Sequence, residues 1–193
     1  MALTLIPPPV STPVDLAQLR AHLRLEEGDD TEYLQHCLDV AIAQFDGDDG
    51  ELGRALIAQS WRESFPWVPA AGGSVELSLS PVSSVLKVEV FNLAGDWDEV
   101  PGSAVELFEV GGRSYVSAAA WPRPGRQRAP LRIEYVAGYG AAASAVPRPI
   151  GHAILLFAAH LYKAREPVVF DAKPVEVPLS ISRLVANYKT WWR

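Results

Sequence analysis

The repeat of apolar residues changes within one stretch, "LRIEYVAGYGAAASAVPRPIGHAILLFAAHLYKAREP", residues 131–167. Its first ten residues are typical of a β-strand that ends in a glycine turn. From Pro147 onward, apolar side chains recur at helical spacing and form one stripe that stops before Pro167. The stripe consists of Ile150, Ile154, Phe157 and Leu161. The stretch therefore predicts a strand followed by a long helix.

Helices are also predicted near the start of the chain. Thr12, Pro13 and Asp15 have the pattern of a helix start, with Thr12 as the N-cap and Asp15 at the capping-box position. Leu16, Leu19 and Leu23 form the stripe of this helix. Asp30 is the expected cap of a second helix, whose stripe is Leu34, Cys37, Leu38, Ala41, Ile42 and Phe45. With one apolar face each, these helices are expected to pack on each other.

Between the helices, in residues 57–137, apolar residues recur at every second position. Val75, Leu77 and Leu79 alternate with polar residues, and proline and glycine separate the apolar runs at the spacing of a small antiparallel sheet. Ile57, Trp61 and Phe65 share one face of the first run. The same face also carries Gln59 and Glu63.

The sequence thus predicts an α+β fold. A small helical core is built from two N-terminal helices and one long C-terminal helix, with an inserted antiparallel β-rich module and an extended C-terminal arm. A short helix is expected to start in the arm near Ser180, with Ile181, Leu184, Val185 and Tyr188 as its stripe. The expected boundaries are 1–56, 57–137, 138–166 and 167–193.

Composition narrows the class of protein. Of 193 residues, 49% are hydrophobic and 21% are charged, which is ordinary for a globular protein. A net charge of −6 argues against a protein that grips the nucleic-acid backbone. The single cysteine, Cys37, excludes an internal disulfide and suggests synthesis in a reducing compartment. Neither a membrane span nor a signal peptide is expected.

No pattern in the sequence indicates an active site. His22, His36, His152 and His160 lack metal-ligand spacing, and no P-loop, nucleophile elbow or dinucleotide fingerprint occurs. The acidic run "DGDDGE", residues 46–51, lacks the spacing of an EF-hand and is interpreted as a solvated loop. We expect no catalytic residue, no cofactor and no metal ion.

Two stretches are candidates for partner contacts. Arg123, Arg126 and Arg128 gather in "RPGRQR", which is either a solvated hairpin tip or a contact with an acidic partner or with DNA phosphates. The other stretch is the terminal "YKTWWR", residues 188–193. Trp191 and Trp192 could each remove roughly 150–250 Å² from water, worth very roughly 7–12 kcal/mol together at about 25 cal/mol per Å². They are therefore expected either to fold back on their own core or to bind another protein.

Four blocks, in this order, carry a resemblance to a known family. They are "LAQLRAHLRLEEGDDTEYLQHCLDVA", "GRALIAQSWRESF", "AAAWPRPGRQRAPLRIEYVAGYG" and "VPRPIGHAILLFAAHLYKAREPVV". Together they resemble the head–tail connector, or adaptor, proteins of long-tailed phages and of phage-derived gene transfer agents. The similarity runs from about Pro13 to Tyr188, and it departs from the family pattern at "FDGDDGELGRAL", residues 45–56.

The resemblance implies a structural, non-enzymatic virion protein at the head–tail junction, made in the bacterial cytoplasm. Such adaptors form a ring below the portal, expected to be a dodecamer, which extends the DNA channel without sequence-specific DNA binding. They also bind the next tail component, a stopper or terminator. The implied portal-binding residues are Tyr188, Lys189, Trp191, Trp192 and Arg193.

Two other interpretations stay open on the sequence. The chain could be a different tail-tube, stopper or terminator component of a similar particle. It could also be a small hydrolase or ligand-binding domain with a β insert, although the nucleophile and metal patterns of such enzymes are missing.

Overall fold

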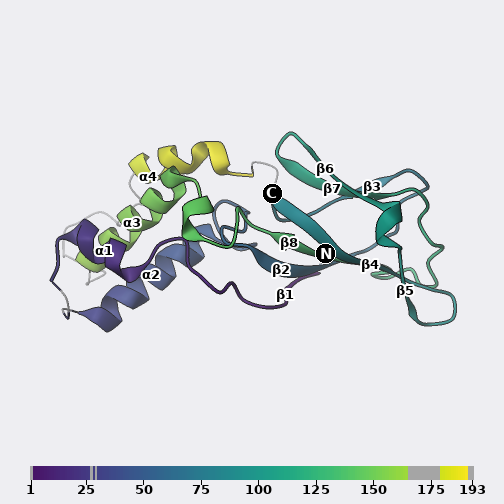
Figure 1. Cartoon of the computed structure of the whole chain (residues 1–193), viewed down its shortest axis with the longest axis horizontal. Coiled ribbons are helices and arrows are strands. Elements are labelled where there is room, and N and C mark those ends of the chain that lie inside the picture. Colours follow the sequence, from purple (N-terminus) through teal and green to yellow (C-terminus); the bar gives the residue numbers. More distant parts are fainter. Residues whose placement is uncertain (1, 27, 29, 165–178, 191–193) are drawn as a thin grey trace, which may run out of the picture.

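The computed structural model describes residues 2–26, 28, 30–164 and 179–190. Helices gather at one end of the molecule and strands at the other, which confirms the predicted α+β class (Figure 1). The helices are α1 (Leu16–Leu23), α2 (Thr31–Phe45), α3 (Arg148–Lys163) and α4 (Leu179–Val185). Short 3-10 turns occur at Gly102–Ala104, Ala143–Ala145 and Ala186–Tyr188. Within the described ranges, no helix combines the length and the apolar character needed to cross a membrane.

Helix α1 begins three residues later than an N-cap at Thr12 requires, so that prediction is wrong. The N-cap is Asp15, whose side chain accepts a hydrogen bond of 2.7 Å from the Gln18 amide. The Gln18 side chain accepts one of 3.0 Å from the Asp15 amide, which completes a capping box. The Thr12 hydroxyl instead donates to the Val14 carbonyl.

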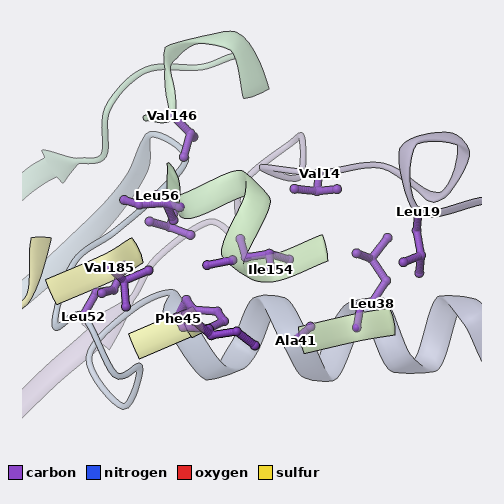
Figure 2. Packing of buried hydrophobic residues seen from close by; sticks show 14 of the residues in the cluster. Val14, Leu19, Leu38, Ala41, Phe45, Leu52, Leu56, Val146, Ile154 and Val185 are labelled. Carbon is purple, nitrogen blue, oxygen red and sulfur yellow. The ribbon is translucent and has the colours of Figure 1, made fainter. Parts of the chain in front are cut away.

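The helices enclose the first hydrophobic core. The expected stripes are confirmed where they matter most: Leu19, Leu34, Phe45, Ile150 and Ile154 are fully buried. Figure 2 shows Phe45 of α2 close to Val185 of α4, with Leu52 and Leu56 of the connecting segment beside them. The segment after α2 therefore closes one end of the helical core.

The strands form two antiparallel sheets, whereas the sequence suggested a single small sheet. One sheet has the order β1-β2-β8-β4-β5 and the other has the order β3-β7-β6. The larger sheet contains β1 (Ala2–Leu5), β2 (Gln59–Phe65), β4 (Val82–Phe91), β5 (Trp97–Glu99) and β8 (Leu131–Ala137). The smaller sheet contains β3 (Ser74–Glu76), β6 (Val105–Val110) and β7 (Arg113–Ala118). Ala2–Leu5, which no pattern in the sequence marked as a strand, pairs with β2 as an edge strand.

A second hydrophobic core is made by residues of both sheets, among them Phe65, Val116 and Ile133. It also takes in a carboxylate: Glu63 on β2 is fully buried. Glu63 accepts hydrogen bonds from the Ser78 amide at 3.0 Å, from the Ser78 hydroxyl and from the Tyr135 hydroxyl at 2.9 Å. Burial raises the pKa of Glu63, against the effect of these donors.

Two crossing segments join the helical end to the β end. The Tyr139 amide donates to the Leu56 carbonyl at 3.1 Å, and the Ala58 amide donates to the Gly140 carbonyl at 2.8 Å. Gly138 has φ +133°, and a Cβ there would lie 2.5 Å from the backbone of Ile57 and Ala58. Glycine is therefore required at position 138, directly after the strand Leu131–Ala137.

The acidic run after α2 is also part of this joint. Asp46 Oδ1 accepts a hydrogen bond of 2.7 Å from the Leu56 amide and lies within reach of the Gln59 side chain. Burial raises the pKa of Asp46, and these two donors oppose the shift. The interpretation of residues 46–51 as a solvated loop is thus wrong for Asp46, which holds the start of β2 against α2.

Candidate partner-binding surfaces

The C-terminal helix is packed on the helical core. Ile181 is 1% exposed and Val185 is fully buried, both within the core formed by α1, α2 and α3. Leu184 and Tyr188 pack against the edge of that core. Figure 1 shows α4 alongside α3, at the end of the molecule away from β5.

Polar contacts fix the residues that follow α4. The Arg54 Nε donates a hydrogen bond of 2.6 Å to the Tyr188 carbonyl. The amide and hydroxyl of Thr190 both donate to the Leu52 carbonyl, at 3.2 and 2.9 Å. Lys189 pairs with the Glu51 carboxylate, with about a fifth of each side chain exposed. The described end of the chain is therefore tied to the segment that closes the helical core.

Tyr139 shares this corner with Arg54 and Tyr188. Burial raises the pKa of the Tyr139 phenol, while the positive charge of Arg54 acts in the opposite direction. The Arg54 guanidinium also lies 3.7 Å from the position of a Cβ on Gly112, in the turn between β6 and β7. Arg54 is thus placed where the helical core and the smaller sheet meet residues 188–190, the base of the C-terminal tail.

Of the five residues expected to bind a portal, the structure places two. Tyr188 and Lys189 are half-buried and contact their own chain. Trp191, Trp192 and Arg193 lie outside the described residues. The last described residues, Lys189 and Thr190, lie beside Glu51 and Leu52.

The three arginines of residues 123–128 have different surroundings. The loop connects β7 of one sheet to β8 of the other, so its interpretation as a hairpin tip is wrong. Arg126 lies over the rings of Phe91 and Trp97, with its guanidinium carbon 4.1 and 4.8 Å from the two centroids. It also donates a hydrogen bond of 2.8 Å to the Ala129 carbonyl. Arg123 and Arg128 are exposed.

A groove beside this loop was not found by sequence reasoning. It is lined by Pro66, Trp67 and Val68, which follow β2, and by residues 124–127 and Pro130 from the loop. Trp67 is 53% exposed there. The signal was present in "FPWVP", residues 65–69, where a tryptophan stands between two prolines directly after a strand.

Over the part of the chain that the structure describes, no group of His, Cys, Asp or Glu side chains could hold a metal ion. His22 and His152 contact each other edge to face, with ring centroids 6.0 Å apart. Cys37 is buried in its helix, as the apolar stripe indicated. The sequence-predicted candidates for partner contacts thus lie in two places, at the C-terminal residues beside Leu52 and in the loop near β5.

No family model matches the chain, and no curated protein matches it. Solved structures do match. One, described as the neck of an empty gene transfer agent (GTA) particle computed with C6 symmetry, has a TM-score of 0.77 and 26% identity, over 98% of this chain and 96% of the other. A chain from the virion of a native GTA particle has a TM-score of 0.74 at 26% identity with the same coverage.

A third match is the neck of a native GTA particle computed with C12 symmetry, with a TM-score of 0.67. Its identity is 22%, so it bears on the fold alone. All three similarities span the helical end and the β end together. The first two, at 26% identity, confirm that this chain resembles the head–tail connector proteins of phages and gene transfer agents.

Proposed function

We propose that the chain is a structural head–tail adaptor, which forms a ring below the portal and connects the DNA-filled head to the tail. The observation that carries the proposal is the similarity, over 98% of the chain at 26% identity, to a chain of a GTA neck. A similarity restricted to the helices or to the sheets could reflect a shared module. One that includes both parts and the joint between them favours the same structural role.

The ring is proposed to be a dodecamer. The neck structure computed with C6 symmetry supports a closed ring. Twelve copies are compatible with that symmetry, because a twelve-membered ring also has a sixfold axis. Such a ring uses a head-to-tail interface, in which one patch of each copy contacts a different patch of the next. The net charge of −6 is compatible with a lumen through which DNA passes without sticking.

The C-terminal tail of the chain, residues 188–193, is proposed to bind the portal. Tyr188 and Lys189 hold its base through the contacts with Arg54 and Glu51. Trp191, Trp192 and Arg193 then supply the contacts to the partner, since Trp and Arg are the side chains most often found as interface anchors. The role requires no catalytic group and no cofactor.

Truncation after Thr190 tests this role. The shortened chain keeps the hydrogen bonds of Tyr188 and Thr190 and the ion pair of Lys189. We expect its circular dichroism spectrum and melting temperature to match those of the full chain. Its co-sedimentation with purified portal rings should be lost.

Trp67→Ala is the matched control, because it too removes an indole, one that is exposed and belongs to the segment after β2 and not to the C-terminal tail. This variant should co-sediment with portal rings as the full chain does. A truncated chain that still binds the portal with unchanged affinity would contradict the proposed role of the tail.

A further inference from the structure

We propose that the larger sheet continues from one copy of the chain to the next, with β1 of one copy paired to the first half of β4 of its neighbour. The inference rests on the proposed adaptor ring and deepens it by naming the two patches of its head-to-tail interface. The partner at both patches is therefore a second copy of this chain.

One border of the larger sheet is β1, which pairs with β2 alone among the described strands (Figure 1). The Ile6 amide donates a hydrogen bond of 2.8 Å to the Ser60 carbonyl, at the end of this pairing. Since bonded and outward residues alternate along an antiparallel pair, the main-chain groups of Leu3 and Leu5 point away from β2. β1 thus presents the amides and carbonyls of these two residues to an added strand.

The opposite side of the sheet is open along the first half of β4. β5 pairs with Glu89–Phe91, and a hydrogen bond of 2.8 Å from the Val100 amide to the Val88 carbonyl extends this pairing by one residue. Among the described strands, only β8 pairs with residues 82–87. This open stretch is long enough for β1, which has four residues.

A groove runs along this open stretch of β4. Ser84, Val85 and Leu86 line it, and Leu107 of β6 is among the residues that complete it. Leu86 is 54% exposed. The register of β4 on β8 shifts between Val85 and Lys87, and the extra residue of such a bulge is left without a partner in the ladder. The groove therefore offers an added strand both apolar side chains and main-chain groups that β8 does not bind.

Neither of these two edges carries a charge. No Asp, Glu, Lys or Arg occurs in residues 2–14 or in residues 77–86. The strands at the other borders of the two sheets, β3, β5 and β6, each contain at least one carboxylate. Charged side chains are a common means by which proteins keep an exposed strand from pairing with another chain. The two edges that lack them are therefore the ones suited to pairing.

Apolar side chains at both edges favour the same contact. Leu5 and Ile6 are 37% and 44% exposed. Leu3 at one edge and Val85 at the other both pack partly against the second hydrophobic core. Because the two edges border the same core, pairing them would bury these side chains and join the cores of neighbouring copies.

The strand directions fit a head-to-tail ring. Successive antiparallel pairings join β1 to β2, β2 to β8 and β8 to β4, so β1 and β4 run in opposite directions. A neighbour related by a small rotation keeps its sheet in nearly the same orientation, and its β1 meets β4 antiparallel. Strand addition of this kind is a recurring mode of recognition. DNA is disfavoured, because neither uncharged stretch can neutralise phosphates.

Photo-crosslinking in assembled particles tests the proposal. Ser84→p-benzoylphenylalanine places the probe at an exposed position of the groove. We expect a crosslink between two copies, which mass spectrometry should map to residues 2–6 of the second copy. Within one copy, β2 and β8 separate β1 from β4 by about 14 Å, at about 4.8 Å for each strand spacing. Particles that contain a mixture of isotope-labelled and unlabelled chains distinguish the two cases directly.

Two matched controls accompany this probe. Glu109→p-benzoylphenylalanine places it at an exposed position of the charged strand β6 and should give no crosslink to residues 2–6. Leu5→Lys should lower the yield from position 84 by about tenfold, equivalent to 1.4 kcal/mol, because a charge on the pairing edge opposes strand addition. Leu93→Lys makes the same change at a leucine that is 75% exposed between β4 and β5, and should leave the yield unchanged.

Should Leu5→Lys lower the melting temperature of the free chain, Leu5→Gln replaces it. A crosslink to DNA, a crosslink to a different protein, or no crosslink in particles that contain the chain would each overturn the continuous sheet and leave the adaptor role intact. Equal yields for Leu5→Lys and Leu93→Lys would do the same. Absence of the wild-type chain from purified particles, seen by immunoblot, would instead contradict the adaptor role itself.

Discussion

Arg54 donates a hydrogen bond of 2.6 Å to the carbonyl oxygen of Tyr188, 134 positions away in the sequence. The contact joins the segment that leaves the helical core to the base of the C-terminal tail. Because Arg54 also lies close to Gly112, in the turn of the smaller sheet, one side chain connects three parts of the molecule. The position of Tyr188, at the base of the C-terminal tail, is therefore fixed by contacts within the subunit.

Arg54→Met should loosen the base of the tail. A hydrogen bond that involves a charged group contributes about 1.5–3 kcal/mol, and urea unfolding should show a loss of this size. Amide hydrogen exchange should accelerate in residues 179–190. Arg62→Met is the matched control, because Arg62 forms an exposed ion pair with Glu134, which is worth about 0–1 kcal/mol. Equal losses for the two variants would contradict the special position of Arg54.

Ile181→Ala should show that α4 belongs to the helical core. Ile181 is 1% exposed, so its truncation leaves a cavity and should cost about 2–5 kcal/mol. Leu93→Ala removes an apolar side chain that is 75% exposed and should change stability by less than about 0.5 kcal/mol. Urea unfolding of both variants decides the point. If Ile181→Ala were as mild as its control, α4 would be only loosely attached in solution.

Gly125→Ala should displace the arginine loop. The added methyl group would overlap the Asn92 carbonyl, so the loop must move and its hydrogen bond to Phe91 should be lost. We expect a destabilisation of about 1–3 kcal/mol, measured by thermal unfolding. Gly102→Ala is the control, because its Cβ meets nothing within 4 Å. A melting temperature of Gly125→Ala equal to that of Gly102→Ala would show that the loop is not held as described.

Glu63 should make stability depend on pH. Burial raises its pKa above the ordinary 4.5, so the folded chain keeps this proton to higher pH than the unfolded chain. The stabilisation from this group is complete below about pH 4.5 and is lost as the pH rises through the folded-state pKa. Glu63→Gln can keep all three hydrogen bonds without a charge. Its stability relative to the wild type should therefore increase as the pH rises above 4.5.

Urea unfolding between pH 4 and pH 8 measures this difference. Glu63→Leu is the companion variant, because it leaves the Ser78 amide and the Tyr135 hydroxyl without their acceptor. It should cost about 1–3 kcal/mol at every pH, because the buried Tyr135 hydroxyl loses its acceptor. A constant difference between Glu63→Gln and the wild type across the range would contradict the raised pKa.

The sequence was most informative where one periodic pattern governs one element. Leu19, Leu34, Phe45 and Ile150 are buried as their helical stripes predicted, because each helix has one apolar face and a single core to cover. The alternation of Val75, Leu77 and Leu79 likewise predicted their burial.

Elements held by non-local contacts were missed. A period of two marks a strand but not its partner, so residues 57–137 could not be divided into two sheets. Glu63 interrupts the apolar pattern of β2 in the sequence. Its burial is explained only by hydrogen bonds from Ser78 and Tyr135, which are distant in the sequence. Trp67 and Arg126 come to line one groove because β2 and β8 pair, which local patterns do not reveal.

The central claim is tested most directly by electron cryo-microscopy of particles assembled with this chain, reconstructed without imposed symmetry. We expect a closed ring of copies between the portal and the tail of the particle, with Tyr188, Lys189 and Thr190 on the side of the subunit that faces the portal. Density for the chain elsewhere in the particle, or as isolated copies outside any ring, would contradict the adaptor role.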